Sequence, residues 1–299
     1  MAIILPEDYH ARTALENRRI HCMTSFQARK QNIRPLRIGI LNIMPVANTY
    51  EYNILFPIGR SVLQIEPVWI RLKTHPYKST SKTHLDKLYI SFEKAIKERG
   101  FDGLIITGAP VEEKEFSEIW FWDELREILN YARSNIASTL GICWGGLALA
   151  YFNGIEKILY DQKLFGVYPL RNINRDHPVT GELDDIFMSP QSRFAGIPDD
   201  VLEEKAAAGE LTLLAHSKDI GYVIFETADK RFMIHLGHPE YETERLGNEY
   251  KRDRSKGLSN VKKPLNLDVE HPVNTWRSHS LEFFTQWIKD VYLRTPYEI

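Results

Sequence analysis

The feature that most constrains the fold of this chain is a cysteine between glycines, placed where a strand pattern changes into a helical one. Residues 136–140 are small, β-branched or apolar, as in a buried parallel strand. Gly-Ile-Cys-Trp-Gly-Gly follows at 141–146, and a helical Leu/Ala pattern comes next. A nucleophile on such a turn has a strained backbone, and the helix directs its positive end at the sulfur. The pattern therefore predicts a catalytic Cys143; the alternative is a packed thiol, since free cysteines are often simply buried.

Composition places the chain among intracellular globular proteins. It has only two cysteines, Cys22 and Cys143, so we expect no disulfide framework and a cytoplasmic location. The formal net charge of −2 argues against a nucleic-acid or membrane partner bound through bulk charge. The N-terminus carries acidic residues and has no long apolar core, unlike a signal peptide. We expect neither a metal nor a tightly bound cofactor.

Strands and helices alternate through the first half of the chain. Strand patterns occupy residues 37–45, 63–72, 103–107 and 136–140, and helical patterns occupy 49–63, 85–99, 120–133 and the residues after Cys143. This alternation predicts an α/β fold with a doubly wound, mostly parallel sheet and flanking helices. The site of such a sheet lies at the carboxyl ends of its strands, where residues 44–45, 108–110 and Cys143 fall.

Shorter elements are expected after residue 155. Alternating patterns predict strands at 164–170, 211–215, 222–226 and 232–236, then a charged helix at 243–256, a polar loop at 257–272 and a helix at 278–291. Residues 1–33 are interpreted as an N-terminal arm with a short helix, and residues 34–299 as a single domain. Cys22 lies in this arm with no base nearby in the sequence, so we interpret it as a packed thiol.

A second motif supplies the base that a cysteine nucleophile needs. Gly237 leaves room for the ring of His238, and Pro239 fixes the chain so that Glu240 can turn back to the imidazole Nδ1. This arrangement holds one tautomer and lets Nε2 face the thiol. His235 lies inside the preceding strand pattern and is interpreted as structural.

Stretches over nearly the whole chain resemble a known family. Gly-Ile-Cys-x-Gly followed far downstream by His-Pro-Glu is similar to the class I glutamine amidotransferase fold. In more detail the chain resembles the homoserine O-acyltransferase (homoserine transsuccinylase) family, which shares that fold. The matching stretches are residues 33–36, 41–45, 101–110, 163–168, 189–193, 237–241, 276–279 and 295–297. The resemblance implies acyl transfer from acyl-CoA to an amino-acid hydroxyl through an acyl-cysteine, in methionine or cysteine biosynthesis.

The resemblance carries over the roles of six residues. Three match catalytic positions: the acylated nucleophile Cys143, the general base His238 and its partner Glu240. Three match positions that contact the substrate, namely Lys163, Ser192 and Arg252. A guanidinium binds carboxylate bidentately, so Arg252 fits an α-carboxylate clamp, and a solvated helix charge is the alternative. The implied substrates are acetyl-CoA and homoserine or serine, and a homodimer is left open.

The second residue after Gly-Ala-Pro sorts the acyl donors of this family: glycine goes with succinyl-CoA and glutamate with acetyl-CoA. This chain has Glu112 there. The distal carboxylate of a succinyl group would meet the Glu112 carboxylate, and two like charges about 4 Å apart repel by about 4 kcal/mol at an effective dielectric of about 20. The alternative is that Glu112 and Glu113 are only acidic residues at the start of a helix.

Two departures from the family pattern concern the acceptor. Typical members carry a lysine just after Met-Pro, where residues 46–49 are Val-Ala-Asn-Thr, and Ala-x-Gln after Cys-Trp, where residues 145–147 are Gly-Gly-Leu. We expect homoserine as the acceptor, with serine as the alternative. Homoserine O-succinyltransferase and glutamine amidotransferase activities are less favoured, the latter because Leu147 stands where its signature has glutamine. A non-catalytic binding protein would be expected to lack part of the catalytic set.

Overall fold

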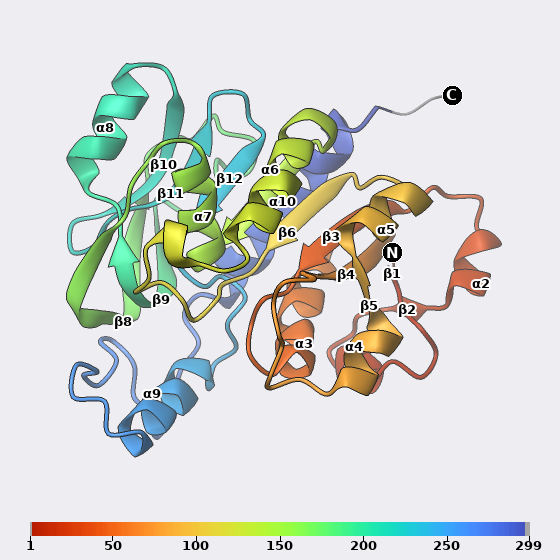
Figure 1. The fold of residues 1–299 in the computed structure, drawn as a ribbon, viewed down its shortest axis with the longest axis horizontal. Helices are drawn as coiled ribbons and strands as arrows, with labels where there is room; N and C mark the ends of the chain where they lie inside the picture. Colours follow the sequence, from red (N-terminus) through yellow and green to blue (C-terminus); the bar gives the residue numbers. More distant parts are fainter. Residues whose placement is uncertain (1, 297–299) are drawn as a thin grey trace.

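The computed structural model describes residues 2–296; Met1 and residues 297–299, which include the end of the 295–297 stretch, lie outside it. Within these residues one sheet of twelve strands organises the fold (Figure 1). Its strands are β1 (Ile3–Ile4), β2 (Cys22–Met23), β3 (Leu36–Leu41), β4 (Ile65–Arg71), β5 (Tyr89–Ser91), β6 (Gly103–Ile106), β7 (Ser138–Ile142), β8 (Ile158–Asn172), β9 (Ile186–Gly196), β10 (Leu211–Ser217), β11 (Gly221–Thr227) and β12 (Phe232–His235). The order is β2-β1-β4-β3-β6-β7-β12-β11-β10-β8-β9, and β5 pairs with β4.

The predicted fold class is confirmed. Neighbouring strands from β2 to β12 along this order are parallel, and the pairs from β12 to β9 are antiparallel. The register aligns Leu41 with Ile106 and Ile106 with Gly141, so β3, β6 and β7 end at one edge of the sheet. The segments that leave these strands, with the one that leaves β12, therefore meet there.

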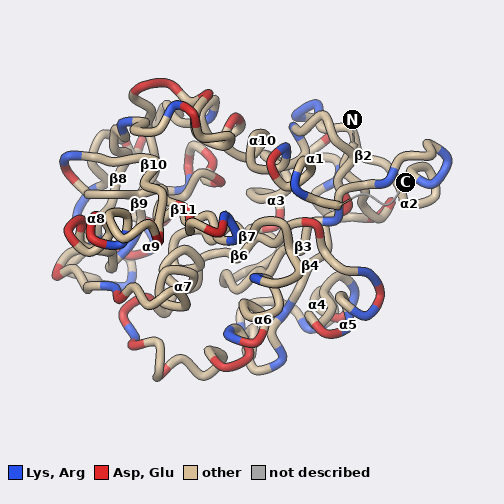
Figure 2. The backbone as a smooth tube through the Cα atoms, turned by 90° about the horizontal axis from the view of Figure 1, so that it is seen from above, with Lys and Arg blue, Asp and Glu red and all other residues tan. Residues whose placement is uncertain are grey.

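Helices cover both faces of the sheet. They are α1 (Arg12–Asn17), α2 (Ser25–Arg29), α3 (Ala47–Ile58), α4 (Lys82–Leu88), α5 (Phe92–Glu98), α6 (Trp122–Asn135), α7 (Trp144–Phe152), α8 (Asp199–Ala207), α9 (Arg245–Ser255) and α10 (Arg277–Arg294), with a 3₁₀ turn at Phe116–Glu118. Helices α6 and α7 pack together on one face, and α3 and α10 pack on the other (Figures 1 and 2). In the described part of the chain, no helix combines the length and apolarity needed to cross a bilayer.

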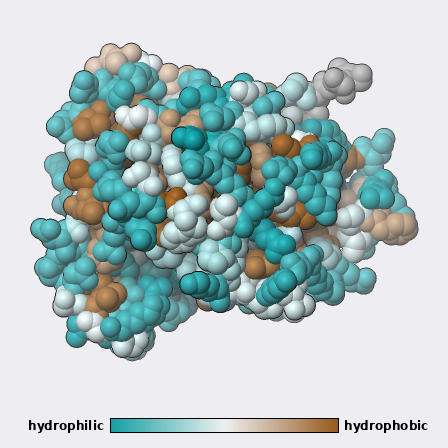
Figure 3. Space-filling model, viewed as in Figure 1, coloured by the Kyte–Doolittle hydropathy of each residue, from teal (hydrophilic) through white to brown (hydrophobic). Residues whose placement is uncertain are grey.

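The surface is mixed in charge and mostly hydrophilic. Lys and Arg are interspersed with Asp and Glu over the whole backbone (Figure 2). On the face in Figure 3, hydrophobic side chains form small separate spots among hydrophilic ones. Scattered exposed apolar residues of this kind are normal for a globular protein.

The helix predicted over residues 85–99 is wrong, because β5 interrupts it between α4 and α5. Tyr89 pairs with Trp69 of β4, and its buried hydroxyl donates to Glu51 at 2.8 Å. Ser91 then caps α5 with its side chain. These contacts join residues far apart in the chain, so the tertiary structure overrides a helical period that looks continuous in the sequence.

The second half contains two elements that the sequence patterns do not predict, β9 and α8, and β8 is longer than expected. Strand β9 contains Pro190 and buried polar residues, and Arg193 Nε donates to Gln191 Oε1 at 3.1 Å. Proline is tolerated because β9 ends the strand order. Polar residues that satisfy one another inside a strand hide the alternation that marks a strand in the sequence.

The N-terminal arm contributes to the sheet as well as packing on it. Ile3 of β1 pairs in parallel with Ile65 of β4, and β1 also pairs with β2. The expected short helix is α1, and α2 follows it. The division of the chain at residue 33 stays a prediction.

Candidate active site

Cys143 occupies the strained turn that the sequence predicts. It lies between β7 and α7 with φ 53° and ψ −114°, a conformation unusual for a residue other than glycine. Neighbouring glycines make the turn possible: a Cβ on Gly145 would clash with the Ile106 carbonyl oxygen, and one on Gly141 would lie 2.6 Å from the Gly145 carbonyl oxygen. The predicted turn geometry is confirmed. Helix α7 starts directly after the cysteine, so its first backbone N–H groups lie next to Cys143.

His238 and Glu240 follow β12, and their buried side chains interact directly. The His238 Nδ1 lies 2.7 Å from Glu240 Oε1. Burial alone lowers the pKa of His238, but the charges of Cys143 and Glu240 and their hydrogen bonds to the ring raise that pKa well above its ordinary value. The site therefore favours an imidazolium that contacts both the Glu240 carboxylate and Cys143.

Two tyrosines that the sequence analysis did not identify support this pair. The Tyr50 hydroxyl, from α3, donates to Glu240 Oε1, the oxygen that also faces His238. Tyr241 stacks on the imidazole, with ring centroids 4.0 Å apart and an interplanar angle of 19°. Its hydroxyl donates to Glu249 at 2.8 Å. Both tyrosines are buried, so in the sequence they look like ordinary core residues.

A cleft of about 900 Å³ contains the nucleophile, and the three residues expected to contact substrate all line it. They converge on two carboxylates of α9. Lys163 Nζ lies 2.8 Å from Asp253 Oδ2 and 3.7 Å from Glu249 Oε2. Ser192 Oγ donates to Glu249 Oε2 at 2.6 Å, and Arg252 Nε donates to Asp253 Oδ1 at 2.7 Å. The structure thus brings Lys163, Ser192 and Arg252 together in one polar network.

Glu249 is the centre of this network and is buried. Burial raises its pKa, but Lys163 and Arg245 reverse the effect and hold the pKa of Glu249 at about 2. Arg245 Nε lies 3.1 Å from Glu249 Oε1, and its guanidinium carbon lies 5.3 Å from the centre of the Tyr241 ring. The sequence contained a usable signal: Glu249 and Asp253 are four residues apart and share one helix face.

Glu112 lies on the loop after β6 and lines the same cleft. Its Oε1 accepts a hydrogen bond from the Phe194 backbone N–H at 3.0 Å. Burial raises the pKa of Glu112 to about 7, and the Phe194 hydrogen bond and the Lys163 charge oppose this only partly. The nearest helical turn after it starts at Phe116, so Glu112 does not open a helix. Its negative charge, assumed in the repulsion estimate, develops only as the pH rises through about 7.

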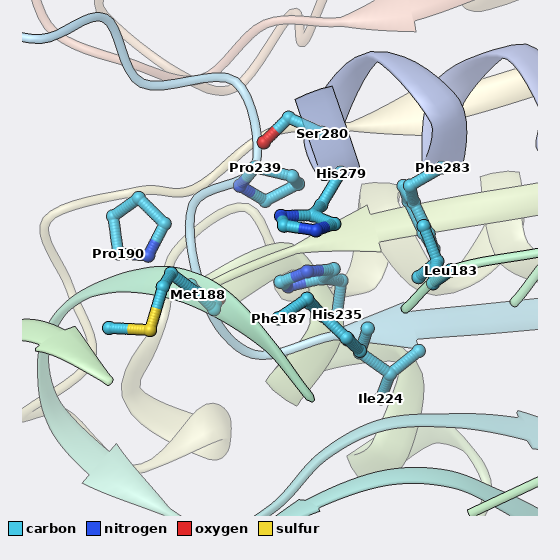
Figure 4. Close-up of a pocket in the computed structure, with 11 residues that line it drawn as sticks. Leu183, Phe187, Met188, Pro190, Ile224, His235, Pro239, His279, Ser280 and Phe283 are labelled. Atoms are coloured by element: carbon cyan, nitrogen blue, oxygen red, sulfur yellow. The ribbon is translucent and has the colours of Figure 1, made fainter. Parts of the chain in front are cut away.

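His235 and Cys22 lie outside the cleft. His235 Nδ1 accepts from the Gly237 N–H at 3.0 Å, and burial lowers the pKa of this histidine to about 3. Figure 4 shows His235 near His279 and Phe283 in a small pocket that Cys143 does not line. Burial raises the pKa of Cys22 to about 11, which leaves it as a neutral thiol. Both residues are structural in this fold.

Among residues 2–296, one group of side chains has donor atoms close enough to share a metal ion, namely His10, Glu51 and His84. These side chains do not line the cleft. The buried Glu51 carboxylate accepts from the hydroxyls of Tyr9 and Tyr89, and His84 Nε2 lies 2.6 Å from its Oε1. The group joins the N-terminal arm to α3 and α4 through hydrogen bonds.

Comparisons with known proteins cover nearly the whole chain. Residues 2–297 match the family described as HTS, homoserine O-succinyltransferase. The chain is 37% identical to a homoserine O-acetyltransferase of Lachnoclostridium phytofermentans, over 100% of both chains. It is 40% identical to one of Jannaschia sp., over 100% of this chain and 96% of the relative.

A glutamine amidotransferase structure from Thermotoga maritima has a TM-score of 0.54 and 12% identity, and the alignment covers 86% of this chain and 99% of that one. At this identity the likeness concerns the fold alone, and it confirms the expected amidotransferase-like architecture. The full-length matches in sequence show the family and the acyltransferase class. This chain belongs to the homoserine O-succinyltransferase family of acyltransferases.

Proposed function

We propose that this protein is a homoserine O-acetyltransferase that uses acetyl-CoA and an acetyl-cysteine intermediate, and that it serves methionine or cysteine biosynthesis. The observation that carries the proposal is the Cys143, His238 and Glu240 set inside a cleft that Glu112 also lines. The names of the full-length relatives support homoserine as acceptor and acetyl as the acyl group.

In the first half-reaction the Cys143 thiolate attacks the thioester carbonyl of acetyl-CoA. The oxyanion accepts from backbone N–H groups at the turn. Candidates are the Trp144 N–H, which starts α7, and the backbone at Gly108, where an added Cβ would lie 3.6 Å from the Cys143 Cβ. The bond between carbonyl carbon and CoA sulfur then breaks, and His238 gives its proton to the departing CoA thiolate.

In the second half-reaction His238 accepts the proton of the acceptor hydroxyl. The hydroxyl oxygen attacks the acetyl carbonyl, the bond to the Cys143 sulfur breaks, and the thiolate–imidazolium pair returns. The acceptor is a zwitterion, which suits the mixed charges of the network. Arg252 can donate to its α-carboxylate, and Glu249 and Asp253 can accept from its ammonium group.

The acetyl-cysteine is tested with acetyl-CoA and no acceptor. One equivalent of CoA should be released in a burst, and mass spectrometry should find one acetyl group on Cys143. Cys143→Ala should abolish both signals. Cys22→Ala is the matched control and should change neither, because that buried thiol lies outside the cleft. Turnover by Cys143→Ala would overturn the mechanism.

The acceptor is tested by measuring kcat/KM for homoserine and serine at saturating acetyl-CoA. The side chain of serine is one methylene shorter than that of homoserine, so its hydroxyl lies farther from the acyl group. A misplacement of the reacting hydroxyl by about 1 Å can cost about a hundredfold in rate. We expect homoserine to exceed serine by about tenfold or more. A higher kcat/KM for serine than for homoserine would show that serine is the acceptor, and it would leave the cysteine mechanism intact. Glutamine hydrolysis is not expected.

A further inference from the structure

We infer that Lys114 and Lys256 form a subsite for the phosphate groups of the acyl donor at the mouth of the cleft. The inference rests on the proposed function, because those phosphates belong to CoA. It adds the residues that hold the part of the donor farthest from the reacting thioester.

The Lys and Arg side chains that line the cleft fall into two classes. Three have carboxylate partners within the network: Lys163 with Asp253, Arg245 with Glu249, and Arg252 with Asp253. The other two, Lys114 and Lys256, form no ion pair within 4.0 Å among residues 2–296. The paired cations organise the interior of the cleft, whereas the unpaired ones keep their charge available to an incoming anion.

Both lysines are exposed and come from segments that are distant in sequence. Lys114 lies two residues after Glu112, on the loop that leaves β6. Lys256 follows the last residue of α9, the helix that carries Arg252. The donor's acyl end must reach the buried interior of the cleft and its charged end must remain near solvent, so ammonium groups at the mouth are placed to meet phosphates.

Apolar surface at the same mouth fits the rest of a CoA molecule. Val46 and Leu258 line the cleft and are 46% and 38% exposed. An arm that carries a dimethyl group and ends in phosphates and adenine combines apolar and anionic parts, and this mouth offers both complements. A cation near a helix C-terminus also stabilises the helix, which gives Lys256 a second reason to be there. That reason does not apply to Lys114, which lies outside the helices.

The test compares acetyl-CoA with acetyl-pantetheine, which has the same thioester and no phosphates. Variants are Lys114→Gln, Lys256→Gln and the double variant. The control is Lys251→Gln, a change on the same helix at an exposed lysine that pairs with Glu270 at 3.4 Å and does not line the cleft. The double variant should raise KM for acetyl-CoA about tenfold, as expected for losing one charge-assisted hydrogen bond or more. Its kcat and its kinetics with acetyl-pantetheine should stay within about twofold of the wild type.

The outcomes separate this inference from the proposed function. An unchanged KM for acetyl-CoA in the double variant, while the wild type turns over acetyl-CoA, overturns the subsite alone. Calorimetric titration with CoA tests the subsite even if neither donor reacts: weaker binding by the double variant than by Lys251→Gln supports it, and equal binding overturns it. Absence of CoA release from wild type would overturn only the proposed function.

Discussion

The pKa of a single carboxyl, Glu112, predicts how donor choice depends on pH. Because this pKa is about 7, the neutral fraction of Glu112 falls about tenfold between pH 6 and pH 8. A succinyl group meets a like charge only on the ionised form. The ratio of kcat/KM for acetyl-CoA to that for succinyl-CoA should therefore rise about tenfold over this range.

In Glu112→Gln the same ratio should be flat with pH, and Glu112→Gly should raise succinyl-CoA turnover relative to acetyl-CoA. Glu113→Gln, a change at the exposed neighbour, should keep the wild-type profile. The test is to measure the ratio of kcat/KM for acetyl-CoA to that for succinyl-CoA at three pH values for each protein. A wild-type ratio that does not change with pH would contradict a role for the Glu112 charge.

Tyr50 is a positioning residue for the base. Its hydroxyl donates to Glu240 Oε1, while Oε2 of the same carboxylate is buried with no partner in the described structure. Tyr50→Phe leaves the carboxylate more negative toward His238 and so raises the pKa of His238 further. A hydrogen bond to a charged group contributes about 1.5–3 kcal/mol, which corresponds to about one pKa unit or more.

The alkaline limb of the pH profile of CoA release should therefore move up by about one unit in Tyr50→Phe. A fall in maximal rate alone could reflect a general structural effect, so the shift of this limb is the informative measurement. A limb that stays at the wild-type pH would show that Tyr50 acts only in packing.

The junction of strand β7 and helix α7 depends on Gly145. A Cβ there would clash with backbone atoms of β6, which cannot move without distorting the sheet. Gly145→Ala should therefore lower the free energy of unfolding by about 1–3 kcal/mol and reduce CoA release. Gly100→Ala is the matched control, because a Cβ at Gly100 meets nothing within 4 Å. Urea unfolding of both variants tests this, and equal stability of the two would contradict it.

The N-terminal arm, residues 1–33, should be necessary for a stable fold of the protein. Strands β1 and β2 extend the sheet beyond β4, and Tyr9 donates to the buried Glu51 carboxylate. A chain that starts at residue 34 exposes the edge of β4 and leaves this carboxylate with one donor fewer. It should unfold at a lower temperature and associate on gel filtration. An unchanged cooperative transition in a monodisperse sample would show that the arm is dispensable.

Features of this protein that depend on local pattern can be predicted from its residues alone. The period of apolar residues showed the alternation of strands and helices. Glycine and proline at fixed spacing showed the turn at Cys143 and the His238 to Glu240 turn, because backbone geometry limits such positions to few residue types.

Features that depend on contacts between residues far apart in the chain become visible in the folded protein. Tyr50 and Glu240 are 190 positions apart, and no local pattern connects them. Strand β5 replaced part of a predicted helix because Tyr89 finds partners in β4 and α3. Burial against β9 raises the pKa of Glu112 and so determines its charge. Strand β9 itself was not predicted, because its polar residues lack the alternation of a typical strand. Burial and long-range hydrogen bonds therefore decided which side chains around the nucleophile act together.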